Sequence, residues 1–238
     1  MGKLSFHSIL ICLGLLLVGN LAGWTISAMF VNEAASLSFL RFGVAAAASI
    51  FFVQILAFRF CQKGVSGEFI FRGMSGLSLI WFLISLVLPL AWMQEFSFQG
   101  KLISIGLSLL LFIFNFENGW RHFNEQWAQQ TPVIEKVIAR AGAALDWVEI
   151  EKKLDLSISI HIPGFSKSIE PILSILLVVS MIAGFNLRKI FPIFSMFAWG
   201  IPCIVVSSMV VQMIAINFAK GAKISKLEKE RGVKFDHR

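Results

Sequence analysis

The chain has 238 residues, of which 57% are hydrophobic and only 15% are charged, and its mean hydropathy is +0.78. So few charged side chains cannot cover the surface of a water-soluble domain, so lipid must be the solvent for most of this protein. The net charge of +7 does not call for a nucleic-acid partner, because basic loops and a basic tail that hold membrane orientation account for it.

Six apolar stretches, separated by polar residues, predict an all-α polytopic membrane protein with about six transmembrane helices, since a crossing needs about 20 apolar residues. A polar insertion between the fourth and fifth spans is expected to be cytoplasmic and to hold an amphipathic helix and one short β-strand. The chain therefore divides into spans one to four (1–116), the insertion (117–168), spans five and six (169–219) and a basic tail (220–238). The expected spans are Ser8–Val31, Leu37–Phe58, Ser75–Met93, Leu102–Phe116, Ile169–Asn186 and Phe191–Phe218.

The distribution of basic residues predicts the orientation. Six spans place both termini on one side, and 17 of the 21 Lys and Arg residues then lie on that side. The positive-inside rule therefore predicts cytoplasmic termini in a cell inner (plasma) membrane. Arg41, near the start of the second span, is expected to anchor that helix at the membrane surface by extending its charge toward water.

Small and polar residues within the spans predict contacts between helices. Gly19, Gly23 and Ser27 recur every four residues on the first span, so they line one helix face that another helix can approach closely. Neutral polar side chains inside the spans can hydrogen-bond from one helix to another. They are Asn20, Gln54, Asn115 and Gln212.

The insertion starts with an aromatic helical face. Trp120, Phe123 and Trp127 recur at intervals of three and four residues. This spacing is typical of a helix that leaves the bilayer through the interfacial layer, where aromatic side chains act as anchors.

A second helix is predicted from Thr131 to about Leu154. Thr131 followed by Pro132 is typical of a helix start, with a capping hydroxyl and a proline in the first turn. The apolar residues that follow share one face, and the charges on the other face are mixed rather than uniformly basic. A protein partner or a second copy of the chain is therefore expected to cover this face, rather than anionic lipid alone. The candidate interface residues on it are Ile134, Val137, Ile138 and Leu145.

A short strand is predicted from strict alternation of apolar and polar residues. A lone strand leaves its backbone donors and acceptors open, so it must pair with another chain or be covered locally. Pairing between chains is the interface hypothesis, and packing over the preceding helix is the alternative. The apolar residues of the strand are Leu156, Ile158, Ile160 and Ile162.

No motif for catalysis, cofactor binding or metal binding is recognisable. The four histidines lie in separate segments, and no Cys or carboxylate accompanies them at metal-ligand spacing. His122 and Glu125, three residues apart, supply at most two ligands. We therefore expect no enzyme, no cofactor and no metal.

Three functions fit these expectations. The first is a non-catalytic integral subunit of an oligomeric or multi-protein inner-membrane assembly, which docks partners through the insertion 117–168 and the tail. The second is a homo-oligomeric pore or channel, including a defence-type membrane effector. The third is a small-molecule transporter. The expected partners are the lipid bilayer and further copies of the chain or other protein subunits, and a nucleic acid is not expected.

Overall fold

The computed structural model describes residues 6–61, 64–141, 144–145, 147–158, 170–187 and 189–237. This part of the chain is almost entirely helical. Two residues, Ala144 and Leu145, pair in parallel with Asp236 and His237. The elements in chain order are α1 (Phe6–Phe30), α2 (Glu33–Phe60), α3 (Val65–Ser85), the 3-10 helix η1 (Leu88–Trp92), α4 (Phe98–Ala141), β1 (Ala144–Leu145), α5 (Trp147–Glu151), α6 (Glu170–Leu187), α7 (Pro192–Arg231) and β2 (Asp236–His237).

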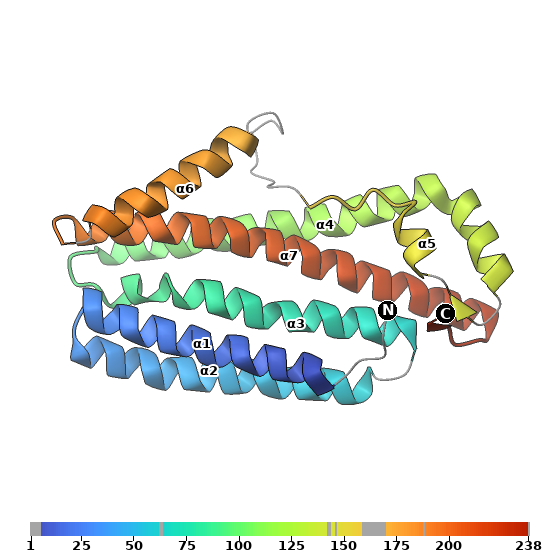
Figure 1. The fold of residues 1–238 in the computed structure, drawn as a ribbon, viewed down its shortest axis with the longest axis horizontal. Coiled ribbons are helices and arrows are strands. Elements are labelled where there is room, and N and C mark those ends of the chain that lie inside the picture. Colours follow the sequence, from blue (N-terminus) through green and yellow to red (C-terminus); the bar gives the residue numbers. More distant parts are fainter. Residues whose placement is uncertain are drawn as a thin grey trace.

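The long helices lie side by side along the longest axis of the molecule, with α3 and α7 at the centre (Figure 1). α3 packs on α1, α2 and α7, while α7 packs on α3, α4 and α6. The bundle therefore consists of two halves, α1 to α3 and α4 with α6 and α7, that meet along the contact between α3 and α7.

Glycines allow α3 and α7 to approach closely. A Cβ atom at Gly73 would lie 2.6 Å from a ring carbon of Phe218, and one at Gly76 would lie 2.6 Å from a side-chain carbon of Ile214. Gly221 on α7 likewise faces Ile70 on α3. The hydrophobic effect does not drive helices together inside a bilayer. Small residues instead let two helices come close enough for dispersion contacts to hold the two halves together.

Five helices within the described residues are long and apolar enough to cross a membrane: α1, α2, α3, α4 and α7. The protein is thus a multi-pass membrane protein by helix length and hydropathy. The expected fifth span corresponds to α6, whose apolar stretch Pro171–Gly184 is shorter than a full crossing. α6 packs on α7 near the loop that joins them and diverges from it along its length (Figure 1).

Two helices are much longer than a bilayer is thick. α4 has 44 residues and α7 has 40, which correspond to about 66 Å and 60 Å against a hydrocarbon core of about 30 Å. Both project past the ends of α1 and α3 at the same end of the bundle (Figure 1). We call the described residues of 120–158 and 216–237, which form this projection, the head.

The structure extends the third span toward the head. α3 begins at Val65 rather than at Ser75, so Arg72 lies inside the helix and not in a loop. Glu68 and Arg72, four residues apart, form an ion pair within α3. Each charge therefore partly neutralises the other, and the helix tolerates both where hydropathy alone suggests a loop.

The predicted helix start at Thr131 is wrong. α4 continues through Pro132 to Ala141 as one helix, and the Thr131 hydroxyl donates a hydrogen bond back to the Trp127 carbonyl oxygen over 2.8 Å. In this position the hydroxyl belongs to the preceding turn and does not cap a new helix. A separate short helix, α5, follows after the pair of residues in β1.

The predicted strand is not found where the structure describes this segment. Residues 155–158 have no regular secondary structure, and the Leu156 side chain packs against the hydrophobic core of the head. Local packing, the alternative to pairing between chains, therefore accounts for Leu156. Ile160 and Ile162 lie outside the described residues.

Candidate functional site

The head has a hydrophobic core of its own. Side chains from the beginning of α3, the end of α4, α5, the end of α7 and the segment after it bury one another there. The apolar face predicted for the helix after Thr131 thus lies on the inside of a small folded unit. The buried members are Val65, Phe69, Phe123, Trp127, Ile134, Val137, Ile138, Trp147, Ile150, Leu154, Ile216, Ala219, Ile224 and Phe235.

Trp147, the first residue of α5, occupies the centre of this core. Its ring centroid lies 4.7 Å from that of Phe69 on α3 and 6.3 Å from that of Trp127 on α4, with the two indoles nearly parallel. The side chain is 2% exposed. Aromatic pairs at such distances add to the area that they bury, so α5 joins two helices that are far apart in the sequence.

A buried lysine joins α7 to the same helix. Lys220 is 5% exposed, and its ammonium donates a hydrogen bond to a Glu151 carboxylate oxygen over 2.5 Å. The Nζ atom also lies 5.3 Å from the Phe69 ring centroid and 5.7 Å from that of Trp147. One carboxylate and two aromatic faces therefore compensate a charge that water does not reach.

We expect Glu151→Gln to lower the free energy of unfolding of the head by about 2 kcal/mol, because it leaves the Lys220 ammonium buried without a counter-charge. The loss is smaller than for a fully buried pair because the Glu151 side chain is 36% exposed. Lys220→Met keeps the apolar stem and removes the charge, so it is expected to be near neutral, and the double variant Glu151→Gln/Lys220→Met should recover stability. Pulse proteolysis of the full chain in a urea series measures each value. Equal losses in both single variants would contradict this assignment.

The C-terminal segment is fastened to the beginning of α3 by one carboxylate. The Ser66 hydroxyl donates to Glu228 over 2.8 Å, and the Phe235 amide donates to the same carboxylate over 3.1 Å. The Val65 amide in turn donates to the Phe235 carbonyl oxygen over 3.1 Å. Gly232, at φ 66°, ends α7 in the left-handed conformation and lets the chain return to α3.

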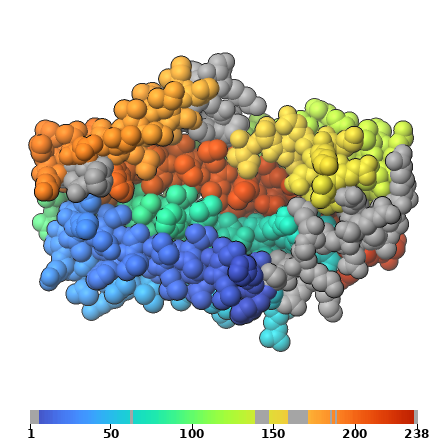
Figure 2. Space-filling model, viewed as in Figure 1, coloured from blue at the N-terminus to red at the C-terminus, as the bar shows by residue number. Residues whose placement is uncertain are grey.

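Charged and polar side chains line a groove where the head meets the membrane spans. One cavity of about 310 Å³ lies between α1 and α3, and another of about 420 Å³ lies between α3, α7 and the segment after α5. The two cavities share Arg72, Ser75 and Met213. In Figure 2, α3 is the green band between α1 in blue and α7 in red. The yellow segment, which contains α5, lies over α7. We call these two adjoining cavities the junction groove.

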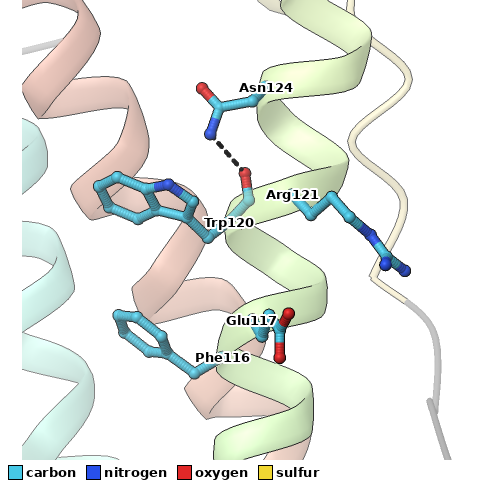
Figure 3. A pocket seen from close by; sticks show the side chains of 5 residues that line it. All are labelled: Phe116, Glu117, Trp120, Arg121 and Asn124. Atoms are coloured by element: carbon cyan, nitrogen blue, oxygen red, sulfur yellow. Dashed lines mark hydrogen bonds between the residues drawn. The ribbon is translucent and has the colours of Figure 1, made fainter.

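Another hollow runs along α4 where this helix enters the head. Figure 3 shows Phe116 and Trp120 pointing to one side of α4 and Arg121 pointing to the other. The two aromatic rings are stacked at 6.4 Å. Asn124 donates a hydrogen bond to the Trp120 carbonyl oxygen (Figure 3), so its amide serves the helix itself.

The small-residue face of α1 is used within the chain. A Cβ atom at Gly19 would lie 3.0 Å from the backbone of Phe82 on α3, and one at Gly23 would lie 2.1 Å from the ring of Phe39 on α2. Ser27 is fully buried. The close helix approach expected from these residues is therefore intramolecular.

Two of the four neutral polar side chains singled out in the spans, Asn20 and Gln54, bond to a neighbouring helix. The Trp81 indole on α3 donates to the Asn20 amide oxygen on α1 over 3.1 Å. The Gln54 amide on α2 donates to the Ser78 hydroxyl on α3 over 2.8 Å. Both pairs are buried, so they satisfy polar groups that lipid cannot.

Among the described side chains that were predicted to form an interface, three lie in the core of the head and Leu156 packs against it. Ile134, Val137 and Ile138 are at most 6% exposed, so an intramolecular core accounts for their apolar pattern. Ile158 is exposed, and the Leu145 side chain is outside the described part of the structure. The residues that we expected to contact a partner thus pack inside the head and stabilise it.

The predicted membrane anchors separate into two groups. Phe123 and Trp127 are buried in the core of the head, whereas Trp120 and Arg41 are exposed. The spacing of the three aromatic residues correctly indicated one face of a helix. It could not show whether lipid headgroups or other parts of the protein cover that face.

The charged residues of the junction were not singled out from the sequence. Glu68 and Arg72 have the four-residue spacing of an ion pair, which was a usable signal inside an apolar helix. Lys220 and Glu151 are 69 residues apart, and no local pattern relates them. Only the three-dimensional arrangement reveals this second pair.

Where the structure describes the chain, no three His, Cys, Asp or Glu side chains are grouped so that they could hold a metal ion. His122 instead lies 2.8 Å from the Asp155 carbonyl oxygen, and Glu125 pairs with Arg121 at 3.6 Å. The head and the junction groove are thus built from ion pairs and apolar side chains. No family model, curated protein or solved structure matches this chain.

Proposed function

We propose that the chain is a non-catalytic integral subunit of an oligomeric or multi-protein inner-membrane assembly, and that the head docks its partners. The observation that supports this proposal most is the continuity of α4 and α7 from the membrane into the head. Two uninterrupted helices transmit position and force between the bilayer and a surface outside it, which a simple anchor does not require.

The exposed surface of the head supports the same proposal. Its core is filled from within, so partner contacts fall to side chains that the core leaves outside, including Val133, Val148 and Ile158. Glu135 and Lys136 lie exposed beside Val133. Apolar side chains within a mixed-charge surface are typical of protein contacts rather than of adsorption to lipid headgroups.

The proposed orientation places the head and both termini in the cytoplasm. The Phe6 end of α1 and the Arg231 end of α7 point to the same end of the bundle (Figure 1). Within the described residues, that end carries most of the Lys and Arg side chains, whereas Lys101 and Lys189 lie at the other end. The positive-inside rule favours the cytoplasm for the more basic end.

Native mass measurement after mild extraction from the membrane tests the proposal. We expect a complex heavier than the 26.5 kDa chain. The double variant Val133→Glu/Val148→Glu should reduce its mass, whereas the matched control Val133→Thr/Val148→Thr should not. A lone monomer, or a complex unaffected by the glutamates, would contradict head docking. A ring of identical copies that conducts ions in liposomes would favour the pore instead.

A further inference from the structure

We propose that the junction groove is a binding site for a zwitterionic aminophospholipid, with the phosphate at Arg72, the ammonium group at Glu151 and an acyl chain between α1 and α3. The proposal is independent of any partner of the head. It rests on the position, the charges and the polarity gradient of the groove.

The position of the groove matches the headgroup layer of the bilayer. Lys220 is 28 residues beyond the first residue of α7, or about 42 Å along the helix. A hydrocarbon core is about 30 Å thick and the whole bilayer about 40–45 Å, so this level falls within the headgroups. Gly221 and Ile70, which are in contact across α3 and α7, place Arg72 at the same level.

The polarity of the groove changes along its length as that of a phospholipid does. Arg72, Ser75 and Asn217 are at its polar end. Ile11, Leu15 and Leu79 line the part that lies deeper in the bundle. A lipid with its phosphate at the polar end would lay an acyl chain along the apolar part.

The two ion pairs present opposite charges to the groove. In the α3 pair, Arg72 is the accessible partner, with its side chain 37% exposed against 5% for Glu68. In the other pair, Glu151 is accessible, at 36% against 7% for Lys220. Both accessible groups line the same cavity of about 420 Å³. Glu68 and Lys220 also line the groove but are nearly buried. The accessible charges that a ligand meets are therefore one cation and one anion.

This pair of charges selects a class of headgroup. The Arg72 guanidinium offers a fork of N–H donors that suits phosphate oxygens. The Glu151 carboxylate accepts hydrogen bonds from a primary ammonium group, which a quaternary ammonium cannot donate. A purely anionic headgroup would pair with Arg72 but would bring no positive charge to the Glu151 carboxylate. Phosphatidylethanolamine fits both groups, and phosphatidylglycerol and phosphatidylcholine each fit one.

Native mass spectrometry of the full chain with added lipid tests the proposal. We expect phosphatidylethanolamine to bind about tenfold more tightly than phosphatidylglycerol or phosphatidylcholine of the same acyl chains. Glycerophosphoethanolamine, which lacks acyl chains, should bind much more weakly. Equal binding of the three lipids, preference for phosphatidylglycerol, or equally tight binding of the headgroup alone would overturn the proposal without any variant.

Paired variants then separate the two ends of the headgroup. Glu68→Gln/Arg72→Gln removes the α3 pair without leaving a buried carboxylate unpaired. It should weaken the binding of all three lipids about tenfold, because each carries the phosphate, and leave the preference for phosphatidylethanolamine in place. Glu151→Gln/Lys220→Met should make phosphatidylethanolamine and phosphatidylglycerol bind alike. The control Arg121→Gln/Glu125→Gln removes an exposed pair of the same spacing on α4 and should change nothing. An equal loss in the control would overturn the assignment to the groove.

Discussion

Trp147→Ala is expected to lower the free energy of unfolding of the head by about 3–5 kcal/mol, the usual cost of removing a buried tryptophan from a packed core. The indole is 2% exposed and contacts Phe69 and Trp127. Its removal leaves a cavity between α3, α4 and α5, which the long helices α3 and α4 cannot close without moving in the membrane. Urea midpoints from pulse proteolysis of the full chain measure the effect.

The matched control is Trp120→Ala, an identical substitution on α4 at a side chain that is 38% exposed. Little packing is lost there, so we expect a change below about 1 kcal/mol. If the two variants unfolded at the same urea concentration, the head would not have the aromatic core described above.

Gly119→Leu is expected to separate α4 from α7. A Cβ atom at Gly119 would lie 2.6 Å from the Gln212 backbone oxygen, and a backbone atom cannot turn aside as a side chain can. Overpacking typically costs about 1–3 kcal/mol and more where the backbone must shift. For a chain of this size a loss of about 3 kcal/mol lowers the melting temperature by about 6–12 °C, measurable by size-exclusion chromatography after heating.

Gly106→Leu provides the comparison for Gly119→Leu. It lies on the same helix, and a Cβ atom there would have nothing within 4 Å. A leucine at that position adds apolar surface in a membrane span, so the melting temperature should stay within about 2 °C of the parent. Equal melting temperatures for the two leucine variants would show that α4 and α7 are not packed together at Gly119.

Hydropathy and length were sufficient to predict the membrane class of this protein, because lipid requires long apolar helices whose backbone groups are satisfied internally. The four-residue repeat of Gly19, Gly23 and Ser27 also indicated a tightly packed helix face. Neither signal depends on which residues meet across the bundle. Both can therefore be recognised from a short stretch of the sequence.

The course of α4 could not be predicted in the same way. Proline within a helix costs about 3 kcal/mol, which favoured a new helix at Pro132. The burial of Ile134, Val137 and Ile138 against the rest of the head outweighs that cost, since each buried apolar side chain contributes about 1.5–3 kcal/mol. Tertiary packing thus decides the outcome, and the residues that supply it are far away in the sequence.

The charges of the junction illustrate a second limit. The sequence placed Lys220 at the start of a basic cytoplasmic tail, directly after the sixth span. Lys220 lies in the core of the head, with a counter-charge that α5 brings to it. The burial of Lys220 could not be predicted, because the partner of a buried charge can come from any part of the chain.

Hydrogen–deuterium exchange of the full chain in lipid nanodiscs tests most directly the claim that α4 and α7 continue from the membrane into a folded head. We predict slow exchange for the amides of 120–138 and 216–230, comparable with that of the membrane-spanning parts of the same helices. Exchange of these two segments at the rate of an unstructured chain, with protection confined to the spans, would contradict the account.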